Sequence, residues 1–236
     1  MTSGTLLMLP GDPALQVRLR RSARARRISL RVSRIDGGIT LTLPPCTPQR
    51  QGERFLAERA DWVRAALSGV DAPVRVAPDT VLPVEGRAIT ITRGTTRGIR
   101  LEDDRLILPP AGRPGALVAN WLKLRARERI LPEIERLADM LGRAARRPPG
   151  SLRLADPRGR WGSCAASGNL MLSWRLMLAP PKVLDYVVAH EVAHLAQMNH
   201  SPAFWATVAQ LMPDHAQHRA WLRTHGAGLH RYSFAE

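Results

Sequence analysis

The chain has few cysteines, few lysines and no long apolar run, and each shortage excludes a class of protein. Its 236 residues include two cysteines, Cys46 and Cys164, which lie far apart and outside any C-x-x-C pair. A structural zinc site built on cysteine is therefore not expected, and a disulfide between them is not expected in a reducing compartment. No apolar run approaches the roughly 18 residues of a membrane helix.

The first ten residues also lack the basic segment and the long apolar run of a signal peptide. We therefore expect a soluble cytoplasmic protein with no membrane partner. The length fits one large domain or two small ones, and 44% of the residues are hydrophobic, which is ample for a buried core.

Positive charge is plentiful, and nearly all of it is arginine, because Lys123 and Lys182 are the only lysines. The formal net charge is +15, but an arginine bias is also typical of GC-rich coding sequences, so position matters more than number. The segment 17–35 has no acidic residue and eight arginines: Arg18, Arg20, Arg21, Arg24, Arg26, Arg27, Arg31 and Arg34. This Arg18–Arg34 strip can bind nucleic-acid phosphates or an acidic partner. The alternative is a solvated strand face.

Alternating apolar and polar residues predict a β-rich first half. Strands are expected at 15–20 and 27–33, and the turn signal Asp36-Gly37-Gly38 predicts a returning strand at 39–43. Thr47-Pro48 predicts the start of a helix that Gly69 ends. Further short strands are expected at 81–84, 88–92, 99–101 and 106–108.

A proline- and glycine-rich junction at 109–114 indicates a boundary between subdomains. The predicted parts are an N-terminal tail (1–14), a β-rich subdomain (15–112) and a helix-rich subdomain (113–236). The last begins with a helix to about residue 141, in which Pro132 predicts a kink or a break. Its expected apolar face is Leu117, Trp121, Leu124, Leu131, Ile134, Ala138 and Leu141. No internal repeat is evident.

The most informative segment reads H-E-x-x-H, from His190 through Glu191 to His194. Residues four apart lie on the same face of a helix, so the two imidazoles can bind one zinc ion. Glu191 can then activate a water molecule on that metal. A third ligand at His200 would complete a catalytic site whose fourth position stays open for water.

Such a short string also arises by chance, so its context matters. Apolar residues surround the motif on both sides of the helix, which predicts that the helix is largely buried. His200 lies ten residues after His190, so the chain must turn back to bring it to the metal. Asn199 is the expected turn residue because asparagine tolerates a left-handed backbone, and Ser201-Pro202 restarts a helix.

Several separate motifs resemble the YgjP-like family of zinc metallopeptidases, over about residues 15–232. They are R-W-G-S-C at 160–164, a strand at 169–176 that ends in W-R-L, H-E-x-x-H at 190–194, and N-H-S-x-x-F-W at 199–205. One departure is Val192, where the family has leucine. The resemblance implies an α+β fold with a β-rich N-terminal half. It also implies a zincin-like helical core with a small antiparallel sheet, related to the SprT-type proteases.

The resemblance further implies that His190, His194 and His200 bind Zn²⁺ and that Glu191 is the general base of a metallopeptidase acting on a protein or peptide. Two alternatives stay open: a metal-dependent nucleotide pyrophosphatase acting on UTP, and a protease that binds nucleic acid through the Arg18–Arg34 strip.

Two features of the expected site stay open as well. The strand at 169–174 could align an extended peptide by edge pairing, and the loop at 160–164 could lie beside the site or be a structural turn. Residues considered for oxyanion stabilisation are Tyr186, His218, His230, Tyr232 and Arg160.

Overall fold

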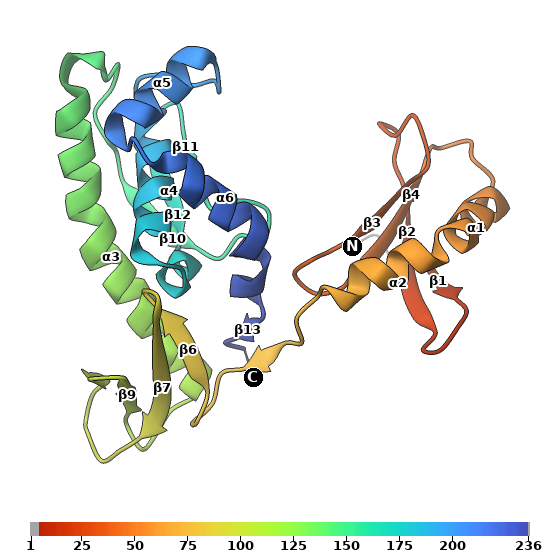
Figure 1. Ribbon diagram of the computed structural model, residues 1–236, viewed down its shortest axis with the longest axis horizontal. Coiled ribbons are helices and arrows are strands. Elements are labelled where there is room, and N and C mark those ends of the chain that lie inside the picture. The colour runs from red at the N-terminus through yellow and green to blue at the C-terminus, as the bar shows by residue number, and fades with distance from the viewer. Residues whose placement is uncertain (1–4, 236) are drawn as a thin grey trace. The chain divides into compact units, whose positions relative to one another are not determined.

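The computed structural model describes residues 5–235, and the chain forms two compact units that divide between Pro73 and Val74 (Figure 1). The expected boundary near residue 112 is wrong. Residues 74–112 share their apolar core with the following helix, since Leu82 and Leu106 belong to the same buried cluster as Leu122. The fold is α+β, as expected.

The first unit is a four-stranded sheet with two helices. Its strands follow the order β1-β2-β4-β3, in which β2 and β4 are parallel and the outer pairs are antiparallel. The elements are β1 (Leu6–Leu9), β2 (Leu15–Arg21), β3 (Ser29–Val32), β4 (Ile39–Leu43), α1 (Gln49–Glu58) and α2 (Ala60–Ser68). The predicted tail over 1–14 therefore contains a paired strand, while its residues 1–4 lie outside the described residues.

One face of this sheet carries the core of the unit. Val17 and Leu41 are fully buried together with Val63 of α2. The single helix predicted after Thr47 is divided at Arg59, whose backbone leaves the helical region, and Gly69 ends the second part as expected.

The second unit begins with another four-stranded sheet of the same topology. Its order is β6-β7-β9-β8, again with a parallel central pair between two antiparallel ones. Its strands are β6 (Val81–Val84), β7 (Arg87–Arg93), β8 (Arg100–Glu102) and β9 (Arg105–Leu108). The two sheets are a structural repeat that the sequence does not reveal, because many sequences satisfy the same alternation of apolar residues.

A long helix, α3 (Pro114–Leu141), packs against this second sheet and continues without a break through Pro132. Pro132 has no N–H to donate to the carbonyl of Glu128, four residues earlier. Both residues are exposed, so that carbonyl can bind water instead. The predicted apolar face is partly wrong, since Leu124 is 63% exposed. The buried stripe is Val118, Leu122, Ala126, Ile130, Ile134, Leu137 and Leu141.

The rest of the second unit combines a small sheet with three helices. Its elements are β10 (Leu152–Ala155), β11 (Gly162–Cys164), β12 (Leu170–Ser173), the 3₁₀ helix η2 (Trp174–Leu178), α4 (Pro181–Ala193), α5 (Pro202–Leu211) and α6 (His215–His225). A short strand near the C-terminus, β13 (Tyr232–Ser233), pairs with β5 (Val74–Arg75). Within residues 5–235, no helix is both long and apolar enough to cross a membrane.

The small sheet has the order β10-β12-β11 and is mixed, whereas an antiparallel sheet was expected. β12 is parallel to β10 and antiparallel to β11, because the chain crosses to the far edge of the sheet before β11 turns back into β12. β12 therefore lies in the centre and has no free edge, so it cannot align a peptide as predicted. β11 is an edge strand of this sheet, and it contacts α4.

Candidate metal centre

Helix α4 carries His190 and Glu191 through the interior of the second unit. Pro181 occupies its first turn, where a missing N–H costs nothing, and the helix is buried on almost every side, as its composition predicts. His194 caps its C-terminus with helical dihedral angles. Its ring therefore stays on the same side as that of His190, with 5.1 Å between the ring centroids.

The chain turns directly after this helix, earlier than predicted. Asn199 does not adopt the left-handed backbone that was predicted. Within residues 5–235, the non-glycine residues with a positive φ are Asp79, Glu85 and Asp103. The turn is instead closed by tight backbone hydrogen bonds, including one that the Gln197 N–H donates to the Ala193 carbonyl. α5 then begins at once, because the Ser201 hydroxyl accepts a hydrogen bond from the Phe204 N–H.

This turn brings His200 to the two histidines of the motif. One ring nitrogen from each of His190, His194 and His200 lies within 4.8 Å of the others. The Nε2 atoms of His190 and His200 are 3.1 Å apart, close to the separation of about 3.3 Å between two nitrogen ligands of a tetrahedral ion. The three imidazoles could therefore hold a metal ion.

Hydrogen bonding supports this arrangement. Nδ1 of His194 lies 2.9 Å from the Gln197 carbonyl oxygen, which can only accept, so Nδ1 carries the proton. The Nε2 lone pair of His194 is thus free for a metal, and the carbonyl fixes the ring orientation. Nδ1 of His190 is buried without a hydrogen-bond partner among the described residues. The polar contact of this ring, with Nε2 of His200, is therefore made by its own Nε2.

Phe204 supports all three imidazoles from behind. It is fully buried, it stacks on His194 at 4.4 Å, and it presents its ring edge-on to His190 and His200 at 4.9 and 4.8 Å. Burial, together with the charges of His194 and His200, lowers the pKa of His190 to about 3. The ring is therefore neutral at pH 7, which is the form that binds metals.

Glu191 lies beside this cluster and is 5% exposed. Burial raises the pKa of its carboxyl to about 7, although the charge of Arg160 acts in the opposite direction. The neighbouring strand approaches it closely at Gly162, where an added Cβ would stand 2.5 Å from the Glu191 Oε1. The segment 160–164, left open by the sequence, thus includes an edge strand in contact with Glu191.

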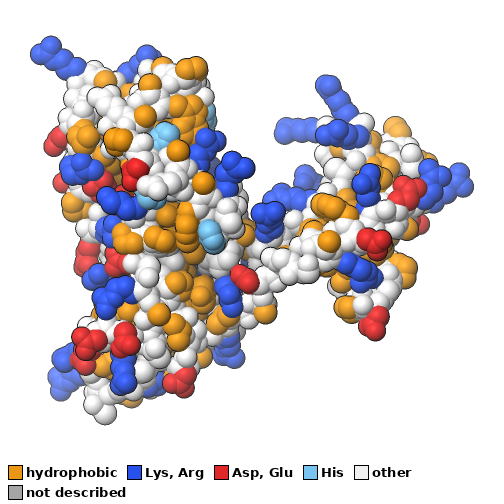
Figure 2. Space-filling model, in the orientation of Figure 1, with side chains coloured by type: hydrophobic (Ala, Val, Ile, Leu, Met, Phe, Trp, Pro, Cys, Tyr) orange, Lys and Arg blue, Asp and Glu red, His pale blue; other side chains and the backbone are white. Residues whose placement is uncertain are grey.

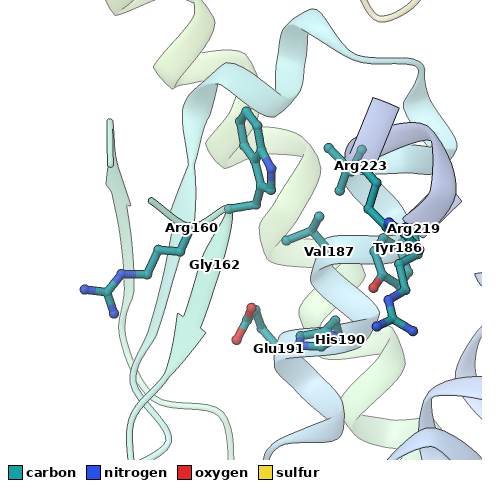
Figure 3. A pocket seen from close by; sticks show the side chains of 10 residues that line it. Arg160, Gly162, Tyr186, Val187, His190, Glu191, Arg219 and Arg223 are labelled. Atoms are coloured by element: carbon teal, nitrogen blue, oxygen red, sulfur yellow. The ribbon is translucent and has the colours of Figure 1, made fainter. Parts of the chain in front are cut away.

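A pocket of about 420 Å³ opens over Glu191 and His190 (Figure 3). Its floor belongs to α4, one wall to the segment before and within β11, and the other wall to α6. Tyr186 and Arg160 line it, whereas the other three oxyanion candidates do not. The full lining is Arg160, Trp161, Gly162, Tyr186, Val187, His190, Glu191, Arg219, Leu222 and Arg223.

Comparison with protein families identifies this architecture. The pattern described as YgjP-like, metallopeptidase domain, matches residues 26–225. The chain belongs to the YgjP-like metallopeptidase family. The resemblance noted in the sequence is thereby confirmed, and the matched range contains the whole histidine cluster. No curated protein and no solved structure matched the chain.

Three residues of this YgjP-like site were not singled out by the sequence argument. Phe204 and Gly162 fell within noted motifs, but their contacts with the histidines and with Glu191 required the fold. Arg219 lies outside the noted motifs, one helical turn before Arg223 on α6.

Proposed function

We propose that the protein is a zinc-dependent metallopeptidase in which His190, His194 and His200 bind zinc and Glu191 is the general base. The observation that carries the proposal is the convergence of three imidazoles beside a buried carboxyl group. Zinc suits an all-nitrogen set of ligands. When bound, it would supply the Lewis acidity that acidifies water and polarises a peptide carbonyl.

Glu191 suits the exchange of a proton with that water. Burial raises the pKa of the Glu191 carboxyl to about 7, whereas the charge of a bound zinc ion would favour the carboxylate, which is the form that accepts a proton from water. Glu191 can therefore take a proton from the attacking water and deliver it to the leaving amine. The low-dielectric surroundings that raise the pKa also exclude competing water.

The substrate is expected to bind along β11. Within residues 5–235, this strand pairs with β12 alone, so its other edge is available for an extended peptide. β11 lies beside Glu191, and hence a peptide added to that edge would pass over the pocket.

The test is replacement of Glu191 by Gln in zinc-loaded protein. Zinc content, measured by elemental analysis, should stay near that of the wild type, while peptide turnover falls by about 100-fold or more. His194→Ala should lose both zinc and turnover. Undiminished hydrolysis by Glu191→Gln would contradict the assignment. Release of pyrophosphate from UTP, lost in His194→Ala, would instead support the nucleotide pyrophosphatase.

The first unit supports a second candidate function, binding of nucleic acid by the protease. Val17 and Leu19 of β2 face the buried side of the sheet, so Arg18 and Arg20 lie on the opposite side. Arg18 is in register with Thr40 of β4, which also pairs with Arg31 of β3. These exposed arginines and the hydroxyl between them form a row that suits phosphate groups.

This candidate predicts binding to duplex DNA that weakens steeply with salt. Fluorescence anisotropy should show a lower affinity and a shallower salt slope after Arg18→Gln, Arg20→Gln and Arg31→Gln combined. Arg54→Gln, on the exposed surface of α1, is the matched control. Absence of binding at low salt would exclude the function.

A further inference from the structure

We propose that Arg219 and Arg223 of α6 form an anion-binding subsite that selects peptides with an acidic side chain next to the cleaved bond. The inference rests on the proposed peptidase function and specifies its substrate class. It concerns the α6 wall of the pocket, which faces the wall formed by the segment before and within β11.

The two arginines are placed to act on one ligand. They lie four residues apart on α6, hence on the same side of the helix, and both line the pocket that contains His190 and Glu191. Figure 3 shows them on the side of the pocket where Tyr186 and His190 also lie. Both side chains are exposed, so a substrate can reach them.

Arg219 is held in position before any substrate binds. Its guanidinium group lies 4.4 Å from the centre of the Trp205 ring, a cation–π contact that orients the side chain. Trp205 is itself packed beside His190 and His200, with ring centroids 5.8 and 6.0 Å apart. The positive charge is therefore held beside the histidine cluster.

Among the described residues, no carboxylate pairs with either of these arginines. Within residues 5–235, neither Arg219 nor Arg223 forms an ion pair, and Glu191 is the single acidic residue that lines the pocket. Figure 2 shows basic side chains gathered over α6, whereas the acidic side chains on that face of the unit lie mostly over α3 and the β6–β9 sheet. An unpaired arginine pair in a pocket favours a ligand that brings its own negative charge.

An acidic side chain of a bound peptide fits this position. A peptide paired with the edge of β11 would direct alternate side chains to opposite sides, so one of them could extend across the pocket towards α6. The pocket, at about 420 Å³, has room for a side chain of that size. A carboxylate there could accept hydrogen bonds from the guanidinium group of Arg219, while Glu191 stays free for proton transfer.

The experiment compares peptide pairs that differ only by Glu or Gln at one position, scanned on both sides of the cleaved bond. Full-length, zinc-loaded protein should show kcat/KM about 10-fold higher for Glu at one position, as expected for a charged hydrogen bond. Arg219→Gln combined with Arg223→Gln should abolish that preference, so that the variant gives equal kcat/KM values for the Glu peptide and the Gln peptide. Arg127→Gln, on the exposed side of α3, is the matched control.

A binding measurement separates this subsite from the peptidase proposal. Zinc-loaded Glu191→Gln should bind the Glu peptide more tightly than the Gln peptide by a similar factor, measured by anisotropy of labelled peptides, even if no cleavage is found. Equal affinities at every position, or a preference that survives both arginine substitutions, would overturn the subsite. So would arginine-dependent binding of UTP without any charge preference among peptides.

Discussion

Glycine at position 162 is required by the group opposite it. A Cβ at this position would stand 2.5 Å from Oε1 and 2.6 Å from Cγ of Glu191, well inside van der Waals contact. The backbone of β11 can therefore approach the carboxyl group only because no side chain intervenes. The strand therefore restricts where the carboxyl group can lie, while Glu191 still lines the pocket.

We expect Gly162→Ala to lower peptide turnover by at least about 10-fold, because small displacements of the proposed general base are costly. Its melting temperature should fall as well, because the added Cβ would stand 2.6 Å from Cγ of the buried Glu191 side chain, so more than the end of that side chain must move. Turnover and thermal melting of the variant, compared with Ser163→Ala in the same strand, test this. A fully active Gly162→Ala enzyme would show that the position of Glu191 tolerates displacement.

The sequence predicts His190, Glu191 and His194 because their spacing places them on a helix, and it predicts His200 from the turn signals and the family resemblance. It does not predict Phe204 as the common support of the three rings, nor the contact between Arg219 and Trp205. These contacts depend on how α5 and α6 fold back on α4, which local patterns do not encode. Asn199 shows the same limit, because the turn is made by backbone hydrogen bonds that involve Gln197 rather than by a left-handed residue.

At the scale of elements, Arg175 joins segments that are distant in the sequence. It is 8% exposed. Its guanidinium forms a bidentate pair with Asp156 after β10, at 2.6 and 2.9 Å, and donates hydrogen bonds to the carbonyls of Leu229 and Tyr232. The strand-rich and C-terminal parts of the unit are thereby held together around η2.

Asp156→Asn should reduce the free energy of unfolding by about 1–3 kcal/mol, because it removes a charge-assisted pair and leaves the buried guanidinium without its counter-charge. Urea denaturation followed by circular dichroism measures the change. Arg153→Gln, exposed on β10, is the control and should differ little from the wild type. Equal stabilities of Asp156→Asn and the wild type would show that the hydrogen bonds of Arg175 to the two carbonyls are enough to hold it in place.

The elements themselves were predicted unevenly. The strands from β2 to β4 and from β6 to β9, the end of α2 at Gly69 and the buried character of α4 agree with the sequence patterns, since each rests on local periodicity or capping. The mixed order β10-β12-β11 and the repeated topology of the two larger sheets depend on pairing between distant strands. No local pattern distinguishes such pairings.

At the scale of the whole molecule, burial of histidine couples stability to pH. Burial lowers the pKa of His230 to about 4, with a further contribution from the charge of Arg175, whereas the unfolded chain has a pKa near 6.5. Between these values the unfolded state binds more protons, so the native state loses stability as the pH falls. Above about pH 6.5 the contribution of neutral His230 is fully present.

We therefore expect His230→Gln to weaken the loss of unfolding free energy between pH 7 and pH 4.5. Urea titrations at both pH values measure the difference for the wild type and the variant. His225→Gln, exposed at the end of α6, should behave as the wild type does. An identical pH dependence for His230→Gln would mean that other groups account for the acid sensitivity.

The metal should stabilise one unit and not the other, because the chain has two separate cores and the histidine cluster belongs to the second. Zinc that binds only the folded state at about 100 times its Kd adds about 2.7 kcal/mol. A chelator should therefore lower the melting temperature of the isolated transition that involves residues 74–236 and leave that of residues 5–73 unchanged. Hydrogen exchange followed by mass spectrometry distinguishes the unfolding of the second unit from that of the first. In His200→Ala, the melting temperature of the second unit should be low both with and without zinc. A chelator effect that persists in this variant would place the metal elsewhere.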